Sequence, residues 1–529
     1  MKKVLVADKI SPSGVALLRA QPGYEVVEAY GSSPEKLLEL VRDVHAILVR
    51  SESQVTREVL AAAPSLVCVG RAGVGVDNID VDAATERGVI VMNTPSGNTI
   101  ATAELTFSHL LSLARPVPEA VQSMREGKWD RKTLAGTELF GKNLAILGLG
   151  RIGAEVAKRA LAFGMKVLAY DPYLTEARAK ALGVQISTLD EAFAGADYLT
   201  VHMPLTPETE GLVGKAAFAR MRKGVKIVNC ARGGIVDEAA LSEALASGQC
   251  GGCGFDVFTE EPLPKEHPLR ALPRAHLSPH LGASTAEAQE NVGLEVAEAC
   301  ITVLAGGFPG NAVNLPAVDS QTLAAMRPFL ALGEKLGSLV RQLASPGRVE
   351  SIRLTAFGAG SESGANALAR AVQRGYLRGV SEGVNDVNAP GKLKALGVEF
   401  SSVRSSAEAD YKELILVEAA LAGGAAASAA GTVLGKAQSL RIVAVNGRTL
   451  EFVPEGKLLL IENRDQPGII GALGTLLAKD KVNIANMALS RTGGANALAV
   501  YQLDTAPGAA ALDEIRRNPA IVSARLLEA

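Results

Sequence analysis

A glycine-rich turn between two apolar runs is the first stretch of the chain whose residue types indicate chemistry. Gly148, Gly150 and Gly153 follow the apolar run Leu144–Leu147 and open a helical pattern. In such a turn the first glycine permits the tight bend, the second lets backbone amides approach a pyrophosphate, and the third lets the helix pack against the sheet. The helix N-terminus adds a positive dipole end. The pattern predicts a dinucleotide site.

An acidic residue after the second apolar run indicates which dinucleotide binds. Asp171 follows Val167–Ala169, the next expected strand. Its carboxylate can accept hydrogen bonds from both ribose hydroxyls, and its charge would repel the 2′-phosphate of NADP. The sequence therefore favours NAD as the cofactor.

Three later loops supply the groups that hydride transfer to a keto acid needs besides NAD. These are a cation for the carboxylate, a proton donor, and a partner that tunes the donor. Arg232 follows the expected strand 226–229, and its planar guanidinium suits a carboxylate. His280 is the natural acid/base, and a nearby Glu261 would raise its pKa and keep it protonated for ketone reduction.

The composition excludes several classes of protein. A chain of 529 residues with 48% apolar residues should hold about three or four domains. The formal charge of −2 gives no electrostatic reason to expect nucleic acid or an anionic membrane as a partner. The N-terminal apolar run Val4–Ala7 is too short for a signal peptide, and the uncharged stretch 419–435 is mostly Ala and Gly, so no membrane span is expected.

The five cysteines are scattered and odd in number, which fits a reducing cytoplasm better than a disulfide framework. Cys250 and Cys253 form a CxxC pair, but a structural zinc site requires two such pairs. We therefore expect a cytoplasmic protein with no metal site.

The elements that must position these groups indicate an α/β fold. From residue 4 to 92, short apolar runs alternate with helical stretches, which predicts a flavodoxin-like parallel sheet with helices on both faces. A buried helix over 101–114 leads into the Rossmann-type NAD domain, and a helical stretch over 285–305 returns the chain to the first domain. From residue 457 the pattern is the βαββαβ order of a ferredoxin-like module. The predicted boundaries are 1–97 and 282–316 for the substrate-binding domain, 98–281 for the inserted NAD domain, 317–453 for a third domain and 454–529 for a fourth.

The motifs GLGRIG, NCARGGIVDE, DVFTEEP and PHLGAST, in this order, resemble those of the D-isomer-specific 2-hydroxyacid dehydrogenases, and the match runs from Val4 to about Pro316. Within that family the chain is similar to the long phosphoglycerate dehydrogenases of serine biosynthesis. The resemblance implies NAD-dependent oxidation of D-3-phosphoglycerate to 3-phosphohydroxypyruvate. It assigns acid/base catalysis to His280, the partner role to Glu261 and substrate binding to Arg232.

The resemblance also implies two sets of binding residues. The substrate set includes two arginines at strand ends, where they could hold a phosphate, and consists of Arg50, Ser51, Arg71, Gly73 and Val74. The cofactor set consists of Val74, Gly148, Gly150, Arg151, Ile152, Gly153, Asp171, Met203, Pro204, Cys230, Ala231, Arg232, Asp256, His280, Gly282 and Ala283.

The rest of the chain resembles regulatory and assembly modules. The last module is similar to ACT domains, which bind amino acids at dimer interfaces, so Asp465 could hold the ammonium and Asn483 the carboxylate of an effector, with L-serine expected. The third domain resembles the α+β intervening domain of the long phosphoglycerate dehydrogenases, which implies a role in assembly. Residues 127–131 resemble a segment that reaches across a dimer interface, although a solvated turn anchored by Trp129 explains them equally well. A homo-oligomer, dimer or tetramer, is expected.

Three other functions remain open at this point. A reductase of 2-oxoglutarate, hydroxypyruvate or glyoxylate would use the same three catalytic groups. A non-catalytic NAD-sensing regulator can retain them too, and an amino-acid-binding regulatory protein would make the last module primary. The two extra domains favour a regulated biosynthetic enzyme, because plain reductases usually stop near residue 320.

Overall fold

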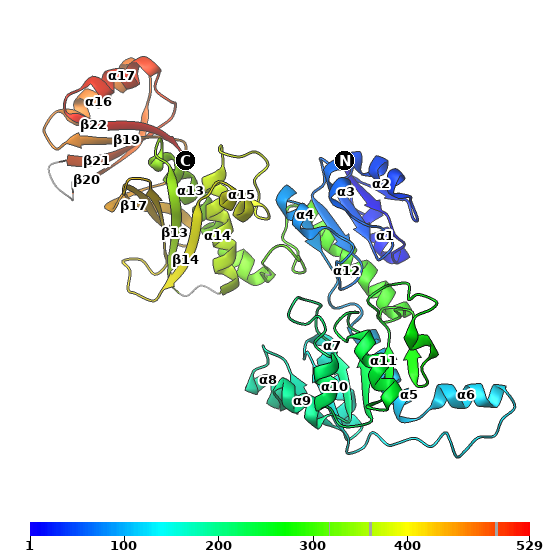
Figure 1. Ribbon diagram of the computed structural model, residues 1–529. Helices are drawn as coiled ribbons and strands as arrows, with labels where there is room; N and C mark the ends of the chain where they lie inside the picture. The colour runs from blue at the N-terminus through cyan, green and yellow to red at the C-terminus, as the bar shows by residue number, and fades with distance from the viewer. Residues whose placement is uncertain (317, 359–361, 492–495) are drawn as a thin grey trace.

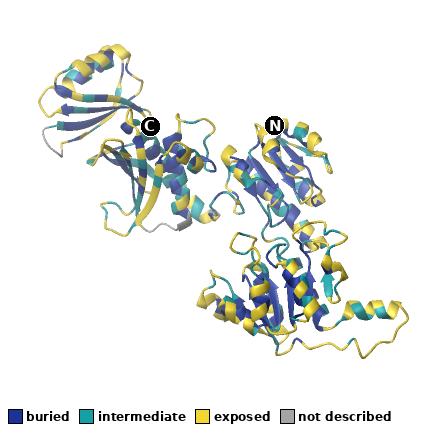
Figure 2. Cartoon of the chain, in the orientation of Figure 1, coloured by how far each residue is buried: buried dark blue, intermediate teal, exposed yellow. Residues whose placement is uncertain are grey.

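The computed structural model describes residues 1–316, 318–358, 362–491 and 496–529, so the boundary predicted at residue 317 lies outside the described residues. Four sheets are arranged in two halves, with two sheets in the N-terminal half and two in the C-terminal half (Figure 1). The strands are mostly buried and the covering helices expose one side (Figure 2). Among the described residues, every helix is too short or too polar to cross a membrane.

The first sheet is parallel, with the strand order β2-β1-β3-β4-β5. Its strands are β1 (Lys2–Val6), β2 (Tyr24–Glu28), β3 (Ala46–Val49), β4 (Cys68–Arg71) and β5 (Ile90–Met92). Helices α2 (Pro34–Leu40), α3 (Arg57–Ala62) and α4 (Val81–Arg87) cover one face, and α1 (Pro12–Arg19) and α12 (Ala286–Leu304) cover the other. Because α12 follows the second sheet in the chain, the return of the chain to the first sheet is confirmed.

The second sheet is parallel and seven-stranded, with the order β12-β11-β10-β9-β6-β7-β8. Counted from β6, this is the Rossmann order with one added edge strand, as expected. Its strands are β6 (Asn143–Leu147), β7 (Lys166–Tyr170), β8 (Gln185–Ile186), β9 (Tyr198–Val201), β10 (Val225–Asn229), β11 (Cys250–Phe255) and β12 (Ala275–Leu277). Its helices are α5 (Thr99–Ala114), α7 (Arg151–Ala162), α8 (Glu176–Leu182), α9 (Leu189–Gly195), α10 (Lys215–Arg220) and α11 (Glu238–Ser247).

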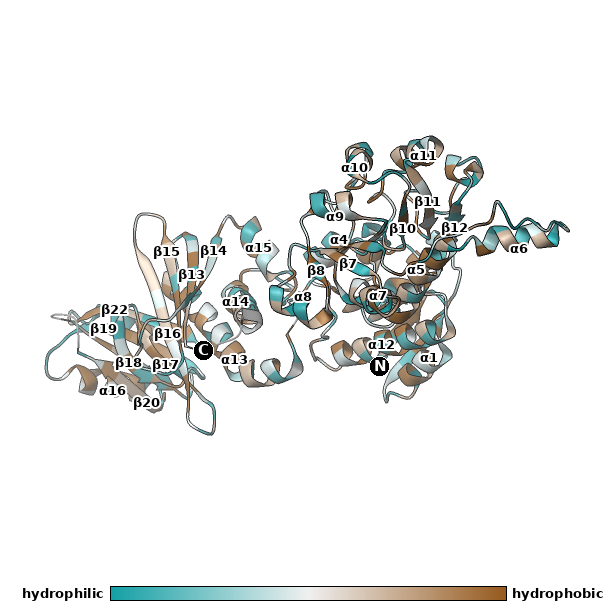
Figure 3. Cartoon of the chain, turned by 90° about the horizontal axis from the view of Figure 1, so that it is seen from below, coloured by the Kyte–Doolittle hydropathy of each residue, from teal (hydrophilic) through white to brown (hydrophobic). Residues whose placement is uncertain are grey.

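Helix α6 (Val117–Arg125) projects from this body, and none of its residues is buried. Seen from below, it extends away from both halves of the chain and carries apolar residues on its surface (Figure 3). We call α6 and the following segment 126–140 the arm.

The C-terminal half holds a mixed six-stranded sheet and an antiparallel four-stranded one. The module of the six-stranded sheet consists of α13 (Ser320–Ala344), β13 (Val349–Phe357), α14 (Glu362–Leu377), α15 (Ala389–Ala395), β14 (Glu399–Ser405), β15 (Leu414–Leu421), β16 (Ala426–Leu434), β17 (Ser439–Val445) and β18 (Arg448–Phe452). The module of the four-stranded sheet has the expected element order βαββαβ. Its elements are β19 (Lys457–Arg464), α16 (Ile469–Lys479), β20 (Ile484–Ser490), β21 (Asn496–Leu503), α17 (Ala509–Arg517) and β22 (Ile521–Glu528).

These two sheets share one hydrophobic core. Leu458 and Val500, on one face of the four-stranded sheet, are buried in the same cluster as Leu339 and Val340 of α13. Arg525 on β22 also donates a hydrogen bond to the Leu343 carbonyl at 2.6 Å. The two modules that the sequence separates at residue 453 therefore pack as one body.

Candidate active site

The glycine turn between β6 and α7 leaves an open space beside a helix N-terminus. Gly148 has φ +93°, and a Cβ there would lie 2.4 Å from the His202 carbonyl oxygen. A Cβ on Gly153 would lie 2.2 Å from the Gly148 carbonyl oxygen, whereas a Cβ on Gly150 would meet nothing within 4 Å. Gly150 is also the N-cap of α7 and no side chain caps this helix, so its first N–H groups can bind the pyrophosphate of a dinucleotide.

The turn is fixed by the acid that the sequence placed after β7. The Asp171 carboxylate accepts hydrogen bonds from the backbone N–H of Leu149 and of Tyr173, both at 2.8 Å. One oxygen holds the glycine turn and the other holds its own loop. Each carboxylate oxygen has a second lone pair that can accept a ribose hydroxyl. These residues fit NAD.

The acid/base candidate is paired with a carboxylate. His280 Nδ1 lies 2.6 Å from Glu261 Oε2, and Glu261 Oε1 accepts a hydrogen bond from the Phe258 N–H at 2.9 Å. Burial raises the pKa of Glu261, but the hydrogen bonds from His280 and Phe258 outweigh it and leave the pKa below its usual value. The carboxylate therefore stays ionised, and the Nε2 atom of His280 is left for a substrate.

His280 stands in a strained loop that a buried aspartate holds in place. Its φ is +55°, a left-handed conformation that is rare for residues other than glycine. The fully buried Asp256 carboxylate accepts hydrogen bonds from the N–H groups of Leu281 and Gly282 at 2.8 Å and from the Ser278 hydroxyl at 2.6 Å. Burial raises the pKa of Asp256, and these donors partly offset that rise. The cofactor role of Asp256 stays a prediction.

Arg232 lies at the contact between the two N-terminal sheets. Its Nε atom is 3.5 Å from Asp77 Oδ2, in the loop after β4. A Cβ on Gly75 would lie 2.0 Å from Arg232 Nη2, so a side chain there would displace the guanidinium from this position. Because the Asp77 side chain is 78% exposed, the ion pair is weak and a substrate carboxylate can replace it.

Of the two predicted phosphate-binding arginines, Arg71 lies near both Arg232 and Arg50, and both are held by residues that the sequence did not single out. Arg71 Nε donates to the Arg50 carbonyl and to Asn78 Oδ1, each at 3.2 Å. Burial lowers the pKa of the Arg71 guanidinium, and the positive charges of Arg232 and Arg50 lower it further. The buried Asp8 carboxylate accepts from the backbone N–H of Arg50 at 2.6 Å. Such crowding of cations favours an anionic ligand.

Asp8 and Asn78 had weak sequence signals. Asp8 follows the first apolar run as the acid at the end of β1, and it also binds the Glu52 and Ser53 N–H groups at 3.1–3.2 Å. Asn78 Nδ2 donates to the carbonyls of Arg50 and Ser53 at 3.0 and 2.7 Å. Both act on the loop after β3, a pairing that only the fold reveals.

The other predicted cofactor residues follow strand ends along one edge of the second sheet. Since β6, β7, β9, β10, β11 and β12 run parallel, their carboxyl ends share that edge. From β6 on, the residues at this edge are Gly148–Gly153, Asp171, Met203, Pro204, Cys230, Ala231, Arg232, Asp256, His280, Gly282 and Ala283. Val74 lies in the first half of the site, where its carbonyl accepts from Asn93 Nδ2 at 2.6 Å. Ser51 follows Arg50 in the loop after β3 and is exposed.

The effector candidates lie outside this site and are paired within the chain. Arg491 donates to both Asp465 oxygens at 2.8 and 3.0 Å, and Asn483 Nδ2 donates to Asp504 Oδ2 at 2.8 Å. Across the described ranges, no group of three or more His, Cys, Asp or Glu side chains is placed to hold a metal ion.

Known proteins match this chain over its whole length. Residues 107–282 match the family described as D-isomer specific 2-hydroxyacid dehydrogenase, NAD binding domain, and residues 325–446 match the D-3-phosphoglycerate dehydrogenase intervening domain. The chain is 39% identical to a D-3-phosphoglycerate dehydrogenase of Archaeoglobus fulgidus over 99% of this chain and 100% of the relative. It is 41% identical to one of Bacillus subtilis over 100% of both.

Two solved structures match a shorter part of the chain. The TT0316 protein of Thermus thermophilus is 38% identical and covers 59% of this chain and 99% of its own, with a TM-score of 0.54. A D-lactate dehydrogenase of Aquifex aeolicus, solved with NAD and lactic acid, is 26% identical, covers 59% of this chain and 99% of its own, and has a TM-score of 0.53. With an NAD-binding domain of the 2-hydroxyacid dehydrogenase type and relatives aligned from end to end, this chain belongs to the D-3-phosphoglycerate dehydrogenase family.

Proposed function

We propose that this protein oxidises D-3-phosphoglycerate to 3-phosphohydroxypyruvate with NAD, the reaction that begins phosphorylated serine biosynthesis. The observation that carries the proposal is the arrangement of the site. A histidine–carboxylate pair lies at the cofactor edge of one sheet, and three arginines converge where the other sheet meets it. The names of the full-length relatives support the same substrate.

The residues divide the reaction between binding and proton transfer. Arg232 binds the substrate carboxylate in place of Asp77 and orients the carbon that carries the hydroxyl group. His280 Nε2 accepts the hydroxyl proton, and the Glu261 carboxylate 2.6 Å from Nδ1 stabilises the imidazolium that forms. NAD, when bound at the glycine turn, would supply the hydride acceptor for that carbon.

Arg50 and Arg71 bind the phosphate group in this proposal. A guanidinium forms paired hydrogen bonds with phosphate oxygens, and two such groups offset the charge of the dianion. The test compares NAD-linked oxidation of 3-phosphoglycerate, glycerate and 2-hydroxyglutarate. Strong preference for 3-phosphoglycerate is expected. Preference for a substrate without phosphate would refute the assignment.

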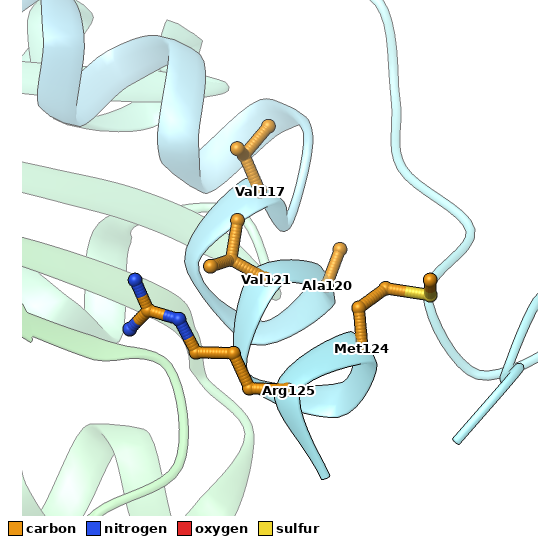
Figure 4. Close-up of a pocket in the computed structure, with 5 residues that line it drawn as sticks. All are labelled: Val117, Ala120, Val121, Met124 and Arg125. Atoms are coloured by element: carbon orange, nitrogen blue, oxygen red, sulfur yellow. The ribbon is translucent and has the colours of Figure 1, made fainter. Parts of the chain in front are cut away.

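We propose in addition that the arm docks on a second copy of this chain. Val117, Ala120, Val121, Met124 and Arg125 line a shallow hollow on α6, where Met124 and Arg125 extend in opposite directions (Figure 4). Val117 is 57% exposed and Trp129 is 77% exposed, so the arm presents apolar surface that a partner copy would cover. Light scattering of the full chain should give a dimer or tetramer, and Val121→Asp should weaken it.

The last module is proposed to bind an amino acid effector, with L-serine the expected one. An effector ammonium would take the place of Arg491 at the exposed Asp465 carboxylate, and Asn483 would leave Asp504. Calorimetric titration of L-serine into the full chain, with Asp465→Asn as the comparison, tests this role.

We also place the enzyme in the cytoplasm, where its five unpaired, buried thiols stay reduced.

A further inference from the structure

Two polar contacts join β12 and the residue that follows it, just before the His280 loop, to the consecutive helices α5 and α6. Ser278 Oγ lies 3.1 Å from His109 Nε2 on α5, and His276 Nε2 lies 2.7 Å from Glu119 Oε1 on α6. Alternate residues of an extended strand share a face, so His276 and Ser278 face these helices together. The Ser278 N–H donates to the Phe255 carbonyl at 2.9 Å and so continues the β11–β12 pairing. His280 follows two residues later, in the loop after β12.

The contact between α5 and Ser278 has a defined direction. Ser278 donates its hydroxyl proton to Asp256 Oδ1, so its oxygen accepts from His109 Nε2–H. His109 is buried, and burial together with nearby His276 lowers its pKa to about 4, which keeps the ring neutral near pH 7. Hydrogen bonds in such a chain strengthen one another. The chain of bonds runs from α5 through Ser278 to the carboxylate that holds the strained His280 loop.

A second residue of α5 binds the same loop on the C-terminal side of His280. The buried Thr102 hydroxyl donates to the Gly282 carbonyl at 2.9 Å. The loop is thus fixed at residue 278 and at residue 282, with His280 midway between them. A small shift of α5 or β12 would move the His280 ring relative to Glu261 and to the substrate.

We infer that His109, Ser278, His276 and Glu119, which we call the β12 seam, position His280 and make its alignment depend on the arm. His109 and Ser278 act on the loop directly, and Glu119 and His276 connect that loop to α6. None of the four touches the reacting atoms, so all are positioning residues. The inference rests on the proposed function of His280 as acid/base.

Two matched pairs of variants test the seam in the full chain with saturating NAD. Ser278→Ala should lower kcat about tenfold with KM within about twofold, and Ser278→Thr, which keeps the hydroxyl, should restore most of the rate. Glu119→Ala should lower kcat about threefold, and Glu119→Gln should retain it, because the amide oxygen still accepts from His276. Glu126→Ala, on the same arm but bonded to the exposed Gln122 and Lys128, should have no effect.

A measurement that needs no turnover tests the β12 seam separately from the proposed function. The amides of Leu281 and Gly282 should exchange hydrogen for deuterium faster in Ser278→Ala and Glu119→Ala than in the wild-type chain, with unchanged exchange in the Glu126→Ala chain. Unchanged exchange in the first two variants, or equal kcat in Ser278→Ala and wild type, overturns the seam. If the wild type oxidises no phosphorylated substrate, the proposed function fails, while the exchange result still decides the inference.

Discussion

Each of the two sides of the active site has a buried aspartate that fixes a loop, but the two loops carry different functional groups. On the first sheet the buried Asp8 holds the loop after β3, and on the second sheet the buried Asp256 holds the loop after β12. Each carboxylate collects backbone N–H groups and thereby fixes a loop. The loop on the first sheet carries Arg50, and the loop on the second carries His280. In the proposed reaction, the first side would bind the substrate by charge, and the second would transfer a proton.

The largest effect should come from removing the proton acceptor. His280→Ala should lower kcat by about 10²-fold or more, because general-base catalysis is lost, while NAD affinity changes little. Steady-state kinetics and NAD titration by fluorescence measure the two quantities. If turnover stays near normal, the second side does not supply the base.

Removing a cation from the first side should act on binding. Arg71→Ala should raise the KM for 3-phosphoglycerate about 30-fold, because a charge-assisted contact to phosphate is lost. The KM for glycerate, which lacks phosphate, should change little. An equal rise in KM for both substrates would mean that Arg71 supports the loop and does not bind the phosphate.

The two aspartates allow a direct comparison of the sides. Asp8→Asn places an amide against N–H donors and should raise KM about tenfold with kcat nearly unchanged. Asp256→Asn should instead lower kcat about tenfold, with KM nearly unchanged. Steady-state kinetics of both variants at one pH measure kcat and KM separately. The same response in both variants would contradict the distinction between a binding side and a proton-transfer side.

The smallest effect at neutral pH concerns the buried His109. Its pKa of about 4 in the fold lies below its usual value of 6.5, so the unfolded chain binds the extra proton between these pH values. Stability is therefore fully present above about pH 6.5 and falls as the pH drops toward 4, by about 2 kcal/mol at pH 5. In His109→Gln this acid loss should shrink. Urea unfolding at pH 7.5 and pH 5 measures it, and an identical loss in both chains would contradict the assignment.

Local features of the site were predictable from sequence, and features that join distant segments were not. Gly148, Gly150 and Asp171 belong to one strand–turn–helix–strand unit, whose glycine spacing follows from the geometry of the turn. Asp8 and Asn78 act on a loop more than 20 residues away in the chain, a relation set by strand order. A single sequence holds no record of that pairing.

The C-terminal half shows a similar limit. Near-continuous apolar runs in β19 and β21 predicted strands correctly, and both faces of these strands are buried. The pattern could not reveal that one of these faces joins the core of α13, since any apolar surface would satisfy it. The predicted division at residue 453 remains a matter of sequence resemblance.

The shared core of the C-terminal sheets bears on how such a protein could change in evolution. Losing the last sheet alone would uncover part of the core that Leu458 and Val500 share with α13, whereas losing both sheets together removes that core whole. We therefore expect the two modules to be gained or lost as a unit. The solved relatives that are complete at 59% of this chain's length show that the dehydrogenase half can exist without that unit.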